Sequence, residues 1–411
     1  MVLDLLNRIN GREYVKKQYI CPECGKTHCT SLENFIKRYS NYTRAICEKS
    51  LEYESIEYLS YQKRAEFIEL ENEIRLNRQT VYYHESVYAN SFITQKEENL
   101  QKLLKECKIE PSGIYHYDEE HLHENGKQIV RLAIIDAVTN LIINDQVICR
   151  EDFDKEFMEI FLKYSLEGLP KKVLITDSHP AYPAIIERIC IKHQLCIFHI
   201  IKNHNDKSYK KINRIQRRIQ TLETKIEENK SKITELKKLS KGLKGPVSKK
   251  DKTRKRRIKK RKKLEQENKR YRKELKQKRK ELKEQERINE RISNIYGTKT
   301  QKGAIRRFRT IYNQLDQFDE DTQKFLKNLD KKFDKTTEYY KNTQIPRTNN
   351  KIEGYFKITL PRHLKRKYRT REGLIRWMRL QKVRWTERNV LYKEPKNAQN
   401  QLDNQKTGAT S

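Results

Sequence analysis

Three acidic residues, far apart in the chain, are of the type and setting that metal-dependent chemistry requires. Asp118 lies in a tyrosine-rich apolar run, Asp177 closes the run Val-Leu-Ile-Thr, and Glu353 opens a helix-like stretch. A fold that brings the two apolar strands beside that helix gathers three carboxylates. Carboxylates so close together repel one another unless a divalent cation lies between them. The three residues therefore predict a divalent metal site.

The composition indicates what such a site acts on. The chain has 411 residues, with 91 Lys and Arg against 56 Asp and Glu, a formal net charge of +35. This excess predicts a polyanionic partner, and a nucleic-acid phosphodiester is the substrate that suits both the charge and a metal–carboxylate site. Only 35% of the residues are hydrophobic and 36% are charged, so we expect the packed core to occupy part of the chain.

The same composition excludes other classes of protein. No apolar run approaches the roughly eighteen residues of a membrane span, and the first residues lack the layout of a signal peptide. The eight cysteines have no framework spacing, which fits a reducing cytoplasm rather than a secreted disulfide scaffold. We therefore expect no membrane partner and a cytoplasmic location.

The sequence around the acids resembles a known family. Asp177 heads the run Asp-Ser-His-Pro-Ala-Tyr, and Thr-Asn-Asn precedes Glu353 by a few residues. With Asp118 as the first acid, the order and surroundings resemble the DDE transposases of prokaryotic insertion sequences, especially the Mutator-like type. Cys196-Ile-Phe-His199 is similar to the Cys-x-x-His signature that follows the second Asp in those enzymes.

The resemblance covers about residues 110–200 and 340–385, and it implies a fold and an activity. The fold is α/β, a ribonuclease H-like mixed sheet with helices on both faces. Asp118, Asp177 and Glu353 would be the catalytic triad and would hold two Mg²⁺ or Mn²⁺ ions. The implied reaction is strand cleavage and strand transfer on double-stranded DNA, at the inverted repeats of the element and at a target. A homo-oligomer on DNA, associated with the nucleoid, is expected.

Two other classes of function stay open. One is a catalytically inactive or truncated transposase-derived protein that only binds DNA. The other is a structural coiled-coil protein with an incidental globular part, although the heptads fill less than a quarter of the chain.

The first part of the catalytic core is predicted over residues 109–204. Strand and helix signals alternate there in the order that a ribonuclease H-like sheet needs. Asp118 then lies within the first strand and Asp177 at the end of the fourth, as neighbours across the sheet. The expected strands are 113–122, 130–136, 141–149, 173–176 and 195–198, with helices at 152–166 and from Pro180.

Asp136 is the rival for the first acid, because Ala-Ile-Ile-Asp also looks like a strand that ends in a catalytic residue. We prefer Asp118, since it lies on the earliest strand and leaves Asp136 at a hairpin corner, where Asp is common for turn reasons. Glu119 and Glu120 are expected to be solvent-facing or to lie behind the metal ligands.

Residues 1–33 contain Cys21-Pro-Glu-Cys24-Gly, the turn with which zinc knuckles aim two thiolates at one ion. Two further ligands are needed, but His28 and Cys29 are so close that the site would be cramped. In the resembling transposases the other half of such a ribbon lies upstream, and the residues before Cys21 contain no Cys or His. The alternatives are therefore a zinc site and a degenerate half ribbon in a truncated copy.

Residues 34–108 have a helical pattern that favours a helix-turn-helix DNA-binding region. Asn77 is placed to cap the recognition helix, and Val81 to face its partner. The alternative is an ordinary surface helix. The side chains expected to contact DNA are Arg78, Gln79, Thr80 and Tyr83.

Residues 205–300 carry isoleucine and leucine at steps of three and four, with Asn229 at one seam position. A break and a similar return arm predict an antiparallel coiled-coil hairpin inserted into the core. Twelve of the fifteen residues 249–263 are Lys or Arg. We expect this tip to follow DNA phosphates, the alternative being a dimerisation arm. The tip residues chosen as DNA contacts are Arg254, Lys255, Arg256 and Arg257.

Residues 301–392 are predicted to return to the catalytic core and to carry Glu353 in the first turn of a helix that Pro361 ends. Trp377 and Trp385 are expected to pack a final helix against the sheet. Residues 393–411 are polar and are expected to be disordered.

Overall fold

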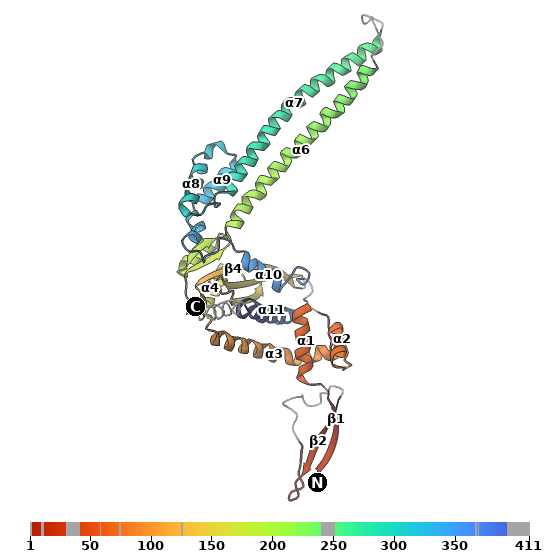
Figure 1. The fold of residues 1–411 in the computed structure, drawn as a ribbon, viewed down its shortest axis with the longest axis vertical. Helices are drawn as coiled ribbons and strands as arrows, with labels where there is room; N and C mark the ends of the chain where they lie inside the picture. Colours follow the sequence, from red (N-terminus) through yellow and green to blue (C-terminus); the bar gives the residue numbers. More distant parts are fainter. Residues whose placement is uncertain are drawn as a thin grey trace, which may run out of the picture. The chain divides into compact units, whose positions relative to one another are not determined.

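The structure is a computed structural model (Figure 1). It describes residues 2–9, 12–29, 42–57, 59–73, 75–124, 126–239, 251–365, 368 and 370–392. Contacts divide the chain into two compact units. Unit 1 consists of Met1–Thr176, Pro180–Lys192 and Asn349–Ser411, and unit 2 of Asp177–His179 and His193–Thr348. The expected disordered tail lies outside the described residues.

The N-terminal part of unit 1 is a small antiparallel sheet in the order β1-β2-β3. Its strands are β1 (Val2–Ile9), β2 (Arg12–Ile20) and β3 (Thr27–Cys29). A tight turn joins β2 to β3: Gly25 N donates to Cys21 O at 2.9 Å, and Gly25 has a φ of 67°. Such a φ favours glycine, which explains its place after the second cysteine.

Three helices follow, α1 (Arg44–Glu57), α2 (Tyr61–Asn72) and α3 (Arg78–Glu106). The side chain of Asn77 accepts from Thr80 N at 2.8 Å and caps α3, as predicted. Val81 is fully buried in a cluster with residues of α1 and α2, also as predicted.

A five-stranded mixed sheet has the strand order β6-β5-β4-β7-β8. β4 pairs antiparallel with β5 and parallel with β7, so β4 is the central strand. This mixed sheet confirms the expected α/β class. The strands are β4 (Ile114–Glu124), β5 (Lys127–Asp136), β6 (Ile142–Cys149), β7 (Val173–Thr176) and β8 (Lys192–Leu195).

Helices cover both faces of the part of the sheet in unit 1 (Figure 1). On one face, α4 (Lys155–Ser165) and α5 (Tyr182–Arg188) pack on β4, β5 and β7 in one cluster that includes Tyr115 and Tyr117. On the other face, α10 (Asn350–Thr359) and α11 (Arg371–Thr386) pack on β4, β5 and β6. α11 continues into the short π-helix Glu387–Leu391. The tryptophans pack as predicted: Trp377 Nε1 donates to Thr359 O, and Trp385 Nε1 donates to Asn140 O.

Unit 2 contains the long helix pair α6 (Ile197–Lys238) and α7 (Lys252–Ser293), followed by α8 (Gln301–Tyr312) and α9 (Glu320–Asp330). The pair confirms the predicted hairpin of helices. Its seam buries Asn229, as predicted, and Asn268, whose Nδ2 donates to Ile226 O at 3.5 Å. Short 3₁₀ turns lie at Leu315–Gln317, Asp334–Thr336 and Glu338–Tyr340.

One predicted strand is wrong. Residues 195–198 were expected to form the fifth strand, but β8 ends at Leu195 and α6 begins at Ile197. The buried residues of this segment follow helical spacing: Ile197, Ile200 and His204. This spacing favours a helix, although the short apolar run alone is also typical of a strand. Cys196 and His199 therefore lie at the start of α6 rather than on a strand. No described helix is long and apolar enough to cross a membrane.

Candidate active site

Asp118 lies in the middle of β4, the central strand, with its side chain half-buried. Successive side chains of a strand alternate between the two faces, so Asp118 shares a face with His116 and Glu120. The opposite face carries Tyr115 and Tyr117, which pack under α4 and α5. Asp118 therefore lies on the face that α10 covers.

α10 is held to this face by Asn349, the residue before its first turn. Asn349 is fully buried: its Oδ1 lies 2.8 Å from His116 Nδ1, and its Nδ2 donates to Tyr117 O at 3.0 Å. The Asn349 side chain thus binds the strand and makes no capping hydrogen bond to the helix that follows it. The buried His116 has its pKa lowered to about 4, mainly by burial, so it is neutral near pH 7 and donates from Nδ1.

A buried arginine holds the same helix further along. Arg131 of β5 is fully buried and forms an ion pair with Asp145 of β6, with Nη2 2.6 Å from Oδ2. Its guanidinium lies 5.0 Å from the ring centroids of both Tyr355 and Phe356 of α10. The hydroxyl of Tyr355 also donates to Asp145. A charge this deeply buried is stable only when paired and hydrogen-bonded, so the network fixes α10 on the sheet.

Glu353 lies in the first turn of α10, as predicted, and is half-buried. It follows the anchoring Asn349 by four residues, which is about one helical turn. Within unit 1, the structure thus brings the helix turn of Glu353 and the central strand of Asp118 to the same face of the sheet.

Asp136, the rival for the first acid, is fully buried and its oxygens are fully used in the hairpin corner. Oδ1 accepts from Val138 N at 2.9 Å and Thr139 N at 2.8 Å. Oδ2 accepts from Ser112 N at 2.6 Å and from the Ser112 hydroxyl at 2.9 Å. This is the turn role that sequence reasoning gave Asp136.

Asp177 directly follows β7, as predicted, and belongs to unit 2. Its Oδ1 accepts from His179 N at 2.9 Å, which shapes the turn that leaves the strand. Among the described residues, no group of three or more His, Cys, Asp and Glu side chains is placed to hold a metal ion.

For two neighbours of Asp118, the solvent-facing alternative is wrong. Glu119 accepts from the Tyr117 hydroxyl at 2.7 Å and from the Tyr182 hydroxyl, and Glu120 pairs with Lys365 and Arg131. Both are half-buried and paired with other side chains, and the other alternative, a place behind the metal ligands, stays a prediction. Burial raises the pKa of Glu120. Sequence reasoning missed Arg131, and its only signal was a charge inside an apolar strand.

The proposed DNA contacts lie at varied degrees of exposure. Arg78, Gln79 and Tyr83 are exposed on α3, whereas the Thr80 hydroxyl donates to Asn77 within the cap. In the basic tip, Lys255 and Arg256 are exposed. Arg254 and Arg257 are half-buried, and Arg257 Nη1 donates to Leu239 O at 3.3 Å.

The knuckle turn holds Cys21 and Cys24 as free thiols. The pKa of the Cys21 thiol is lowered, first by a hydrogen bond from the backbone N–H of Cys24 and next by that of Glu23. A thiol whose thiolate is stabilised in this way is a better metal ligand.

No family model matches the chain. In sequence the chain is similar to an insertion-element protein. That protein, from Methanobrevibacter smithii, is described as the insertion element ISM1 uncharacterized 48.3 kDa protein. The two are 25% identical over 389 residues, which cover 93% of this chain and 78% of that protein.

Proposed function

We propose that the protein is a DNA transposase of an insertion element that cleaves and joins DNA strands with divalent metal ions. Asp118, Asp177 and Glu353 are the proposed catalytic acids. The observation that carries the proposal is that β4 and the first turn of α10 bring Asp118 and Glu353 to one face of the sheet. The similarity to an insertion-element protein over nearly the whole chain supports it independently.

The strand register supports Asp177 as the third catalytic acid. In the parallel pair of β4 and β7, His116 is opposite Ile175. Asp118 and Asp177 are each two residues further along, and two residues of extended chain span at most about 7 Å. Asp177 thus follows the end of the strand that pairs with β4, and this supports its place among the proposed catalytic acids.

The donor set fits the proposed metal. Three carboxylates provide hard oxygen ligands, which Mg²⁺ and Mn²⁺ prefer. When bound, such ions activate an attacking water or 3′-hydroxyl and stabilise the leaving oxygen. The protein's own contribution is rigidity, because Asn349 and Arg131 fix α10 and hence the backbone of Glu353.

DNA would be held by the basic surfaces. The excess of positive charge supports binding to phosphates, and Arg254, Lys255, Arg256 and Arg257 at the start of α7 are proposed contacts of this kind. The exposed Arg78, Gln79 and Tyr83 are proposed to contact the ends of the element. The narrower assignment to the Mutator-like type rests on the sequence around Asp177, Cys196 and Glu353, and zinc at Cys21 and Cys24 is likewise a proposal.

The test uses the full chain, Mg²⁺ and a labelled duplex that carries the DNA flanking the gene. We expect strand cleavage by the wild-type protein and none by the Asp177→Asn variant, with DNA affinity unchanged or improved, because no phosphate-binding cation is lost. Asp152→Asn is the matched control, since Asp152 is exposed. Wild-type cleavage rates in the Asp177→Asn variant would refute the mechanism.

The second candidate is a DNA-binding protein without catalysis. It is favoured by the formal net charge of +35, which DNA binding alone would explain without a catalytic acid. In the same assay it predicts tight DNA binding and no metal-dependent cleavage by the wild-type protein.

A further inference from the structure

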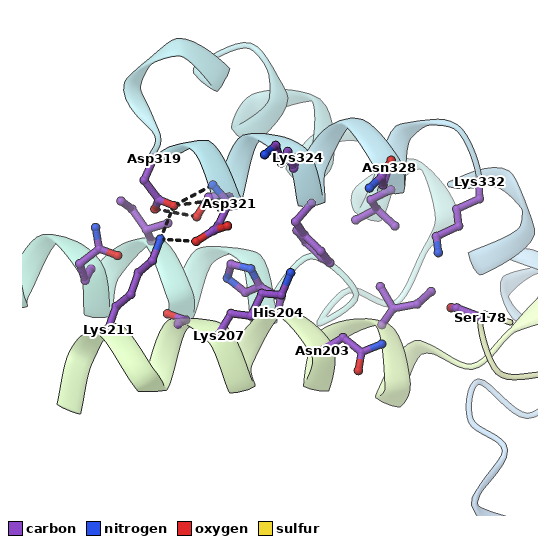
Figure 2. A pocket seen from close by; sticks show the side chains of 17 residues that line it. Ser178, Asn203, His204, Lys207, Lys211, Asp319, Asp321, Lys324, Asn328 and Lys332 are labelled. Carbon is purple, nitrogen blue, oxygen red and sulfur yellow. Dashed lines mark hydrogen bonds and ion pairs between the residues drawn. The ribbon is translucent and has the colours of Figure 1, made fainter. Parts of the chain in front are cut away.

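Unit 2 contains a cavity of about 210 Å³ between the base of α6 and α9. The residue after Asp177, Ser178, also lines it (Figure 2). The volume is several times the roughly 30 Å³ that one water occupies, so it has room for a polyatomic group. Its apolar side is formed by Ile200, Ile288 and Leu329.

At one end of the cavity, one lysine is paired with two aspartates. Lys211 Nζ lies 2.5 Å from Asp319 Oδ1 and 3.0 Å from Asp321 Oδ2. Asp319 also caps α9, accepting from Thr322 N and from the Thr322 hydroxyl. Both aspartates of the lining are therefore paired with Lys211, which balances part of their charge, and the remaining lysines of the lining lie outside this pairing.

The other end is rich in hydrogen-bond donors. Figure 2 shows Asn203 of α6 opposite Asn328 of α9 and Lys332, with Ser178 beside Lys332 and Lys207 beside His204. Four lysines and two aspartates line the cavity, a formal net charge of +2 with histidine neutral. Lys332 is half-buried, and burial lowers its pKa while the charge of Asp177 acts in the opposite direction.

Two buried polar atoms at the cavity lack a hydrogen-bond partner among the described residues. They are Ser178 Oγ and His204 Nε2. His204 is only 5% exposed and lies against Phe325, with ring centroids 4.7 Å apart. Buried polar groups are nearly always hydrogen-bonded to protein, water or a ligand, so these two atoms are available to a polar group that enters the cavity.

We infer that this cavity binds a phosphate group of a nucleic-acid backbone. The groups that would hold it are Lys332, Lys207, the amides of Asn203 and Asn328, the hydroxyl of the half-buried Ser178 and the buried His204. A phosphate has several acceptor oxygens and a negative charge, which match these donors and the local excess of lysine. The inference rests on the proposed function in one respect, namely that the phosphate belongs to DNA. In this arrangement Ser178, the residue after Asp177, contacts the DNA backbone.

The test is residue-specific and requires no catalysis. The full wild-type chain is treated with formaldehyde and a borohydride reagent in EDTA, and methylation of Lys332 and of the exposed neighbour Lys331 is measured by mass spectrometry. The probes are inorganic phosphate and a duplex DNA of random sequence. Because EDTA removes divalent metals, a failed cleavage assay and a failed protection assay are independent results.

We expect DNA to slow the methylation of Lys332 at least tenfold relative to Lys331. If inorganic phosphate also protects Lys332, the phosphate group alone is sufficient for binding. If only DNA protects Lys332, binding of the phosphate group requires the rest of the polymer. Protection by phosphate alone supports an anion site but removes DNA as its ligand. Equal protection of both lysines, or of neither, overturns the inference.

A second measurement uses the affinity for duplex DNA as a function of salt. Lys332→Gln should lower the slope of log affinity against log salt by about 0.9, the value for one lost phosphate contact. Lys331→Gln removes the same charge one residue away and should leave the slope unchanged. Equal slopes for the two variants would contradict a contact at Lys332.

Discussion

The anchoring of α10 by Asn349 gives the sharpest prediction. In Asn349→Ala, His116 Nδ1 and Tyr117 O both lose their partner in a fully buried setting. Each buried group left unsatisfied costs about 1–3 kcal/mol, so the free energy of unfolding of unit 1 should fall by about 2–6 kcal/mol. A loss of that size is a large fraction of the 5–15 kcal/mol that stabilises a typical domain.

The assay is urea denaturation followed by tryptophan fluorescence. The chain has two tryptophans, Trp377 and Trp385, and both are buried on α11 in unit 1. The signal therefore reports the unit that contains α10 and not the long helix pair.

Asn350→Ala is the matched control, because Asn350 is the exposed neighbour at the start of the helix. It should change the stability by no more than about 0.5 kcal/mol. If the two variants unfold at the same urea concentration, or if Asn349→Ala costs less than about 1 kcal/mol, Asn349 does not anchor the helix.

Three further predictions follow from single side chains. Burial lowers the pKa of His116 to about 4 in the folded protein, against 6.5 for the free group, so the unfolded chain takes up the proton first as the pH falls. The free energy of unfolding should therefore fall between about pH 6.5 and pH 4, by about 3 kcal/mol for this residue. Urea unfolding followed by fluorescence at several pH values measures this, and a constant midpoint would disprove it. Asp136→Ala leaves the N–H groups of Ser112, Val138 and Thr139 without their acceptor. The free energy of unfolding of unit 1, measured in urea, should therefore fall by at least about 3 kcal/mol. A fall of less than about 1 kcal/mol would reopen a functional role for Asp136. Because hydrogen bonds lower the pKa of its thiol, Cys21 should be alkylated by iodoacetamide faster than the exposed Cys190 at pH 7, and equal rates measured by mass spectrometry would contradict this.

Elements with strong local signals could be predicted from the residues alone. The apolar run before Asp177 is the strand β7 to the residue, and the seam spacing correctly predicts the long helix pair with Asn229 buried in it. Helix-start chemistry was also readable, since Asn77 caps α3 and Glu353 lies in the first turn of α10. These features depend on neighbours a few residues away, so a local pattern is sufficient to specify them.

Contacts between distant segments could not be predicted in this way. The sequence indicates that Asn349 precedes a helix, but only the fold shows that its side chain binds β4, more than two hundred residues earlier, instead of the helix end. The same holds for Arg131, whose burial depends on Asp145, Tyr355 and Phe356 arriving from two other elements. The end of the fifth strand at Leu195 was also set by packing, because Ile197 and Ile200 are buried on α6. The residues next to a side chain along the sequence do not indicate which distant residues it contacts across the sheet. Only the folded structure therefore reveals which polar groups hold the site in place.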